Sequence, residues 1–238
     1  MSRAAVIARR EVSSYFYSPI AYVAMTLFLI AAGFSFWDDF TPGQPAVMRS
    51  IFEKMVWLLV VVVPVLCMGL LSQEWATGTI ETLMTAPLNE TEVVLGKFLG
   101  SLAFYFVLLV PTLLYVGLLR LYGRPDYGPI FCGYLGLLLV GALFIAISLF
   151  CSSLTRSQVV AAVSSGAILL VTTIVPYYAS SKATLTGFWR SAADQGVLTR
   201  YTDFSKGIID TGNVVFFVAI TAVFLFLTVK VLESRRWK

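Results

Sequence analysis

The sequence contains no histidine and carries little charge. Asp, Glu, Lys and Arg make up 13% of its 238 residues, against about 25% in an average soluble domain. The absence of histidine removes the commonest general base and metal ligand, and no phosphate-binding GxxxxGKS or GxxxxGKT motif occurs. We therefore expect no catalytic residue, cofactor site or metal site in this chain.

Cysteine is also scarce, and its spacing argues against two further kinds of site. The sequence has three cysteines, Cys67, Cys132 and Cys151, and each lies inside an apolar run. Their separation fits neither a metal-binding motif nor a redox motif. We interpret them as small side chains of the packed interior.

The long apolar runs lack charged residues at their centres. The 17 basic and 13 acidic residues fall in loops, at the termini or at the ends of these runs. Ion-driven carriers usually bury an ionisable residue at mid-membrane, and channels carry a charged or carbonyl-lined filter. A secondary transporter and a channel are therefore disfavoured. Ser164 and Ser165 lie within one run, but without a partner base they indicate helix packing.

Hydrophobic residues are abundant and make up 58% of the sequence. Six apolar runs have about the length that an α-helix needs to cross a bilayer, which is near 20 residues. We therefore predict an all-α integral membrane protein with a single domain over residues 1–238. The predicted transmembrane spans cover residues 20–37, 55–71, 98–119, 130–154, 158–179 and 214–229.

Prolines and glycines mark places where these spans should depart from regular helices. Three spans contain proline, and we predict kinks there. The kinks at Pro64 and Pro176 either support a conformational change or are passive irregularities of packing. The fourth span carries three glycines that allow close helix packing. The prolines are Pro64, Pro111 and Pro176, and the glycines are Gly133, Gly136 and Gly141.

Residues 1–18 form a basic segment with aromatic residues at its end. We predict an elbow helix in the membrane interface. A cleaved signal peptide is the alternative, but the following apolar run is longer than a signal peptide requires and lacks its cleavage pattern. The basic residues of the elbow are Arg3, Arg9 and Arg10.

The distribution of Lys and Arg indicates an orientation. With both termini inside the cell, nine of these residues face the cytoplasm and eight face the other side. Seven of the nine lie in the terminal segments, where the positive-inside rule is most informative. We therefore expect cytoplasmic termini, and the net charge of +4 reflects this topology and the lipid bilayer rather than a nucleic-acid partner.

Residues 73–97 are a polar interruption with more pattern than a connector requires. Gly78 and Thr79 provide a break and a candidate N-cap, apolar residues then recur at helical spacing, and Pro87 ends the repeat. This predicts a surface helix of about eight residues, roughly 12 Å long, with Leu83 on its apolar face and Glu81 among its polar residues. An ordinary interfacial loop is the alternative.

A second helix should follow within the same segment. Asn89 and Glu92 have the spacing of a capping box, so this helix should begin at Asn89 and run through Lys97 directly into the third span. A displacement of the surface helix would then be transmitted to one continuous helix that crosses the bilayer.

Residues 180–212 form the longest polar segment, which the predicted topology places outside. Apolar residues recur there at steps of three and four, which predicts an amphipathic helix in the outer interface rather than a flexible loop. We expect this helix to act as a lid, with a shorter helix around residues 188–189 before it. The residues assigned to this outer lid are Tyr201, Phe204, Gly207 and Asp210, and the recurring apolar set also includes Val197 and Ile208.

The order of these features resembles the permease subunit of type-2 ABC transporters. The shared features are the basic elbow, six spans, the loop pattern E-x-x-x-G-T-x-E-x-L-x-x-x-P followed by Gly-Lys, and a helical outer loop. The loop motif is carried by Glu74, Gly78, Thr79, Glu81, Leu83, Pro87, Gly96 and Lys97. The segment Asp203–Asp210 and the arginine-rich tail look most like the gliding-motility branch, which is similar to the copper-handling permease of nitrous-oxide reductase maturation.

The resemblance implies an assembly of two permease chains with two ATPase chains in the bacterial cytoplasmic membrane. ATP and Mg²⁺ would bind to the ATPase partner rather than to this chain. The short helix in residues 73–97 would be a coupling helix that docks on the ATPase, and the elbow would help to clamp that joint. The second and fifth spans would line the pathway at the dimer axis.

The resemblance also suggests a function and further partners. We expect ATP-driven transport, in the direction of export, with accessory periplasmic or membrane proteins as additional partners. The alternative is a membrane scaffold or anchor on which an ATPase docks while nothing crosses the bilayer.

Overall fold

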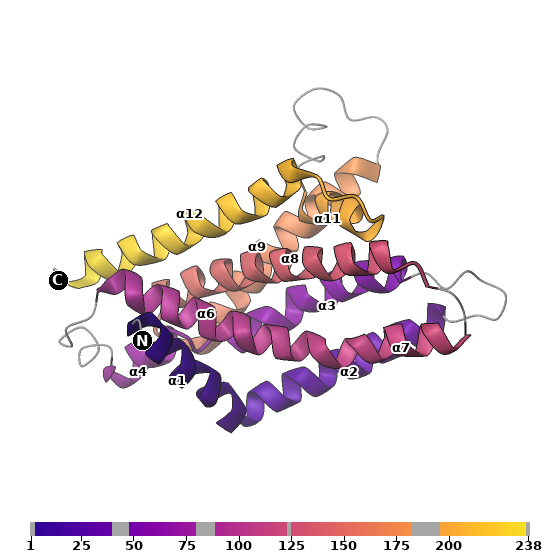
Figure 1. The fold of residues 1–238 in the computed structure, drawn as a ribbon. Coiled ribbons are helices and arrows are strands. Elements are labelled where there is room, and N and C mark those ends of the chain that lie inside the picture. The colour runs from indigo at the N-terminus through magenta and orange to yellow at the C-terminus, as the bar shows by residue number, and fades with distance from the viewer. Residues whose placement is uncertain (1–2, 40–47, 80–88, 123–124, 182–195, 237–238) are drawn as a thin grey trace.

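A computed structural model describes residues 3–39, 48–79, 89–122, 125–181 and 196–236. All regular secondary structure in these ranges is helical (Figure 1). The predicted all-α fold is therefore confirmed.

Six helical segments of the described chain are long and apolar enough to cross a membrane. Even 21 residues of α-helix extend about 30 Å, which is the thickness of the hydrocarbon core. The segments are α2 (Pro19–Asp39), α3 with α4 (Arg49–Cys67 and Ser72–Thr77), α6 with η1 and α7 (Glu90–Leu109, Val110–Thr112 and Leu113–Tyr122), α8 (Tyr127–Leu154), α9 (Gln158–Ser181) and α12 (Thr211–Arg236). Outside them lie α1 (Arg3–Tyr17) and α11 (Val197–Ser205).

The helices extend further than the apolar runs predict, because polar residues continue them at their ends. α3 begins at Arg49 rather than near residue 55. Its Lys54 ammonium lies 2.8 Å from the Asp39 carboxylate at the end of α2, and the Ser50 hydroxyl donates to the same carboxylate at 2.7 Å. This polar contact lets both helices continue beyond their apolar residues.

The predicted start of the helix that leads into the third span is confirmed. α6 begins at Glu90 with Asn89 as its N-cap, and the Glu92 carboxylate accepts a hydrogen bond from the Asn89 N–H at 3.1 Å, which is one of the contacts of a capping box. The helix then continues to Leu109. Lys97 therefore lies within α6 directly before the apolar residues of the third span, as the predicted helix through Lys97 requires.

The three prolines occupy two kinds of context. Pro64 lies inside α3 and Pro176 inside α9, whereas Pro111 belongs to the 3₁₀ turn η1 between α6 and α7. The backbone of the second span is interrupted beyond Pro64, in a turn over residues 68–71. The roles of the prolines in a conformational change stay predictions.

The turn that separates α3 from α4 is stabilised by one side chain of α8. The Ser152 hydroxyl oxygen accepts hydrogen bonds from the N–H groups of Leu71 at 3.1 Å and Ser72 at 3.0 Å. The same hydroxyl donates to the Met68 carbonyl at 3.0 Å. Backbone groups inside an apolar environment need such partners, so Ser152 makes this break in the helix tolerable.

α8 is the central helix and packs through its glycines. An added Cβ atom at Gly133 would lie 2.3 Å from the Phe52 ring, and one at Gly141 would lie 2.2 Å from the Tyr105 ring. At Gly136 it would meet Phe204 at 2.8 Å. The prediction that these glycines allow close packing is confirmed, although their neighbours are aromatic side chains.

α11 is shorter and more buried than the outer helix that the sequence predicts. Tyr201 and Phe204 are fully buried, and the Tyr201 hydroxyl donates to the Gly133 carbonyl of α8 at 3.3 Å. Ile208 lies beyond the helix and is 56% exposed. The apolar face of α11 therefore packs against the protein rather than into the lipid interface.

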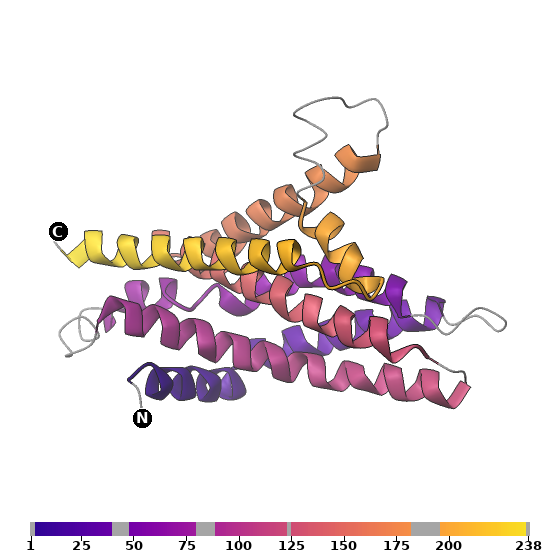
Figure 2. The same cartoon turned by 45° about the horizontal axis from the view of Figure 1, so that its top comes forward.

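The two ends of the helix bundle are distinct. Figures 1 and 2 both show the N-terminus, the C-terminus and α4 at one end. The end of α2, the start of α3, the end of α7 and the start of α8 lie at the other end. The segment that contains α4 and the start of α6 therefore lies on the same side of the bundle as both termini.

The packing of α6 on α8 gives a testable prediction. We expect Gly141→Ala to destabilise the protein by about 1–3 kcal/mol, because the new methyl group displaces Tyr105, whose hydroxyl donates to the Leu137 carbonyl at 2.8 Å. The measurement is thermal unfolding of the detergent-solubilised chain. Gly117→Ala is the control, since no heavy atom lies within 4 Å of its added Cβ, and equal stability of the two variants would contradict the prediction.

Candidate functional site around Lys97

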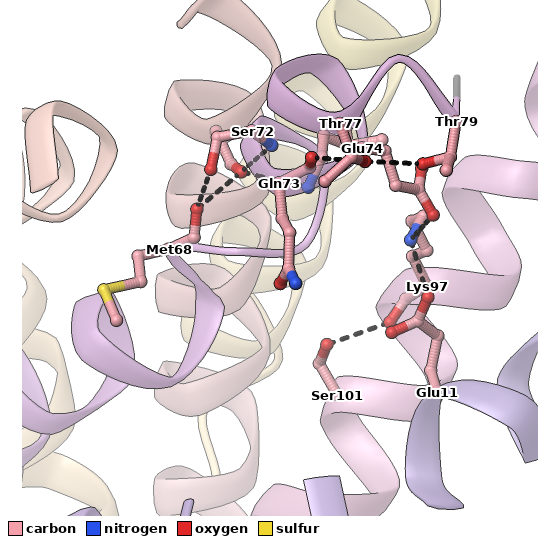
Figure 3. A network of polar contacts seen from close by, with 11 residues as sticks. Glu11, Met68, Ser72, Gln73, Glu74, Thr77, Thr79, Lys97 and Ser101 are labelled. Atoms are coloured by element: carbon pink, nitrogen blue, oxygen red, sulfur yellow. Dashed lines mark hydrogen bonds and ion pairs between the residues drawn. The ribbon is translucent and has the colours of Figure 1, made fainter. Parts of the chain in front are cut away.

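The most unusual charged residue in the described chain is Lys97 on α6. Its side chain is only 3% exposed, and its ammonium lies 2.6 Å from Glu11 Oε1 of α1 and 2.8 Å from Glu74 Oε1 of α4. Figure 3 shows the three side chains meeting between the helices. We call Lys97, Glu11 and Glu74 the Lys97 cluster, and it connects three helices through one cation.

α1 reaches Lys97 because two glycines of α6 let the helices approach closely. A Cβ atom added at Gly96 would lie 2.7 Å from Ile7, and one added at Gly100 would lie 2.7 Å from Glu11. Both would also lie 3.0 Å from backbone carbonyl oxygens of α1. The spacing Gly-x-x-x-Gly is a known pattern for close packing of membrane helices, and here it brings Glu11 within reach of the ammonium.

A second contact between α1 and α6 lies one turn away. The buried Tyr15 hydroxyl is 3.1 Å from Ser101 Oγ and donates to the Leu66 carbonyl of α3 at 3.3 Å. The Tyr15 ring stacks on Phe104 at 4.7 Å between centroids. Burial raises the pKa of Tyr15 well above its usual value, so the phenol stays neutral and keeps its proton to donate.

α4 is also held from the opposite side by the last helix. The Arg235 guanidinium of α12 lies over the Trp75 ring at 4.8 Å and donates to the Leu154 carbonyl at the end of α8 at 2.7 Å. A cation at the C-terminus of a helix is stabilised by the helix dipole. The C-terminal segment therefore positions α4 together with Lys97.

The end of α4 redirects the chain. Gly78 closes the helix with φ of 73°, a left-handed conformation that residues with a Cβ atom rarely adopt. The Thr77 and Thr79 hydroxyls lie 2.9 Å apart across this turn. Gly78 is thus required by the backbone, and the turn leads directly into residues 80–88.

The Lys97 cluster joins three helices through buried ion pairs. A buried ammonium without a carboxylate partner is destabilising by several kcal/mol, so α1, α4 and α6 are held in register while Lys97 is charged. In the described part of the chain, no three His, Cys, Asp or Glu side chains gather as a possible metal site. The arrangement can transmit force between helices.

The structure brings together some of the predicted coupling residues. Glu74 and Lys97 form an ion pair, and Gly78 and Thr79 follow directly after α4. Glu81, Leu83 and Pro87 lie outside the described residues, so their roles stay predictions.

The predicted elbow and outer residues lie in separate places. Arg3, Arg9 and Arg10 belong to α1, and the last two are exposed. Tyr201 and Phe204 belong to α11, whereas Gly207 and Asp210 follow it towards α12. Gly207 has φ of 87° and approaches Pro129 closely, while the Asp210 carboxylate accepts from the Gly212 N–H at 3.0 Å.

The predicted site residues omit two residues on which the Lys97 cluster depends. Glu11 is the second carboxylate, and its signal is an acidic residue within an otherwise basic elbow. Gly100 is the other, because only the pair Gly96 and Gly100 forms the Gly-x-x-x-Gly spacing. A search for that spacing in the third span would have indicated where the elbow packs.

Comparison with known proteins identifies one family. The chain matches the family described as ABC-2 family transporter protein over residues 6–236. No curated protein matches the chain.

The Lys97 cluster predicts a large effect from a single substitution. We expect Lys97→Met to lower the free energy of unfolding by up to about 3–5 kcal/mol, the typical loss when one partner of a buried ion pair is removed, because Glu11 and Glu74 then repel each other. The remaining exposure of these carboxylates, 17% and 22%, reduces the loss. Denaturant unfolding in detergent provides the measurement.

Lys230→Met is the matched control for this experiment. Lys230 is also paired with a carboxylate, at 2.6 Å from Glu233, but its side chain is 52% exposed. Exposed pairs contribute about 0–1 kcal/mol, so this variant should unfold almost like the wild type. Similar losses in the two variants would contradict a structural role of the Lys97 cluster.

Proposed function

The chain belongs to the ABC-2 family of transporter proteins, and from this premise we propose that it is the permease subunit of an ATP-driven exporter. It is a multi-pass membrane protein and the membrane component of a transporter. The proposed export needs a separate subunit for ATP binding and hydrolysis, because this chain has no phosphate-binding motif. Members of this family pair with an ATPase in general.

The Lys97 cluster is the observation that carries the coupling part of the proposal. Glu74 lies on α4, directly before the segment proposed to dock on the ATPase, and Lys97 lies on a helix that runs without interruption from Glu90 to Leu109. Movement of the docked segment would therefore pull on α6 through an ion pair. Glu11 extends the same connection to the elbow helix.

Such coupling requires two arrangements of the helices that the ATPase binds differently. The short ion pairs of the Lys97 cluster favour movement of α1, α4 and α6 as one body. Ser152 and Arg235 link α4 to α8 and α12 as well. We propose that this end of the bundle moves as a unit when the ATPase binds or hydrolyses ATP.

The proposed assembly contains two copies of this chain and two ATPase subunits. Among the spans, α9 and α12 are the least buried within a single copy. This supports contact of their exposed faces with lipid or with a second copy. The proposed pathway follows α3 and α9, where the Ser164 and Thr172 hydroxyls are half-buried and bonded to their own helix. Accessory periplasmic or membrane proteins are further proposed partners.

The proposed location is the bacterial cytoplasmic membrane with both termini in the cytoplasm. The termini and α4 lie at the same end of the bundle (Figure 1), as a cytoplasmic ATPase that docks between them would require. The basic terminal segments support this orientation. The gliding-motility-like branch is supported by the segment Asp203–Asp210 and the arginine-rich tail, and it stays a proposal.

We also propose that α11 closes the outer end of the pathway. Its position between α9 and α12, packed on α8, supports this role. The Arg200 guanidinium donates to Asn213 Oδ1 at 2.8 Å, and Asn213 Nδ2 donates to Asp203 at 3.1 Å. These bonds join α11 to the start of α12, so the two elements should move together.

The coupling proposal is tested in the segment that would dock on the ATPase. We expect Glu81→Arg or Leu83→Asp to leave the chain inserted in the membrane but to lower co-purification of the ATPase subunit, or ATP hydrolysis by the complex in vesicles, by about fivefold or more. Asp38→Arg is the control, because its side chain is 72% exposed at the opposite end of the bundle. Normal binding and hydrolysis in both segment variants would remove the coupling role.

The proposed role of α11 in closing the outer end is tested by weakening the packing of α11 on the bundle. Phe204→Ala removes a fully buried ring that packs on Gly136 and Phe217, a change that costs about 3–5 kcal/mol in a well-packed core. We expect altered ATP hydrolysis by the vesicle-embedded complex with unchanged co-purification of the ATPase. Ile208→Ala, at an exposed position, should change neither, and an unaltered Phe204→Ala complex would argue against a cap.

A further inference from the structure

A cavity of about 770 Å³ lies beside the Lys97 cluster, between the elbow and the ends of the spans. This volume is within the range of sites that bind small ligands, about 300–1,000 Å³. Its walls come from α1, the start of α2, the end of α3, α4 and the start of α9. Several lining residues are exposed, among them Arg10, Ser14 and Ile20, so the cavity opens to the surface.

One wall of the cavity is a polar stripe on α1. Arg10 and Ser14 line it from positions four residues apart on one face of α1, and Ser18 lines it directly after the helix ends at Tyr17. Glu11 and Tyr15 also line the cavity, and both contact α6. The elbow therefore packs on α6 beside the cavity, while Arg10 and Ser14 of the same helix remain exposed.

Arg10 is the cation of this wall that is available to a ligand. The Lys97 ammonium is already shared by Glu11 and Glu74, whereas Arg10 makes no ion pair within the described ranges and is exposed. A guanidinium with two nearby hydroxyl groups is a typical arrangement for binding phosphate. The facing wall adds the polar side chains of Gln73 and Thr77.

The cavity also has an apolar part. Ile20 and Ala21 line it from the start of α2, and Val65 and Leu66 line it from the end of α3. These residues belong to membrane-spanning helices. A free phosphate or a nucleotide would leave this half of the cavity unused.

The depth of the cavity is that of the lipid headgroups. Phe16 and Tyr17 are exposed, at 41% and 88%, and they directly adjoin the lining residues Tyr15 and Ser18. Exposed aromatic residues at the start of a span mark the membrane interface. The polar wall therefore faces the headgroup region, and the apolar wall faces the acyl chains.

We propose that this cavity binds one glycerophospholipid, with its phosphate at Arg10, Ser14 and Ser18 and an acyl chain against Ile20, Ala21, Val65 and Leu66. The lipid would fill the space between the elbow and the spans, next to the joint formed by the Lys97 cluster. The proposal depends on membrane insertion alone and not on the ATPase. Its failure would leave the proposed permease function untouched.

The test is native mass spectrometry of the purified, delipidated full-length chain titrated with phosphatidylethanolamine or phosphatidylglycerol of identical acyl chains. We expect one phospholipid to bind more tightly than any that follow. Arg10→Gln should weaken this first binding about tenfold, the effect of losing one strong charge-assisted hydrogen bond. Ser14→Trp, which places an indole in the cavity, should abolish it.

Adjacent residues provide matched controls. Arg9 and Ser13 are exposed on the same helix but do not line the cavity, so Arg9→Gln and Ser13→Trp should bind the lipid like the wild type. Equal weakening by Arg9→Gln would show general attraction of lipids to a basic helix and would overturn the proposal. Equal binding by all four variants would overturn it as well.

Two partial ligands separate the sources of affinity. Diacylglycerol with the same chains lacks the phosphate, and inorganic phosphate lacks the chains, so neither should displace the bound phospholipid. Displacement by inorganic phosphate would make this a free-anion site, and displacement by diacylglycerol would make it an apolar groove. Thermal unfolding of each variant, measured in parallel, confirms that the chain is folded when it loses the lipid.

Discussion

A single buried ammonium group determines how one end of this protein is arranged. Lys97 is almost completely shielded from water, and it is stabilised because carboxylates from two other helices reach it at 2.6 and 2.8 Å. The cost of burying a charge without partners ties the position of the elbow to that of α4. The close contacts at Gly96 and Gly100, the stacking of Tyr15 on Phe104 and the contact between Arg235 and Trp75 all support this geometry.

The other end of the bundle is held by a different kind of interaction. There, aromatic rings pack against glycines of α8, with Phe52 at Gly133 and Phe204 at Gly136. Such contacts depend on shape, because the interior is close-packed and tolerates little added volume. Shape therefore matters most around the glycines of α8, whereas charge pairing matters most around Lys97.

Much of the fold could be predicted because hydrophobicity and local motifs are encoded in short stretches. The six spans follow from apolar length, and the start of α6 follows from the spacing of Asn89 and Glu92. The Lys97 cluster could be predicted only in part, because Glu11 lies 86 residues before Lys97 and no local pattern connects them. No local pattern predicts the contacts of Ser152 either, because it bonds to backbone groups about 80 residues earlier. The burial of α11 likewise depends on distant residues, the glycines of α8.

Ser152 has a consequence for the evolution of such proteins. A hydroxyl on α8 holds the bend where α3 gives way to α4, so the direction in which the chain leaves the membrane is specified by a distant helix. A loop grafted from a relative would bring neither this serine nor the glutamate on the elbow. Chimeras within the family should therefore exchange these distant positions together with the loop as one set.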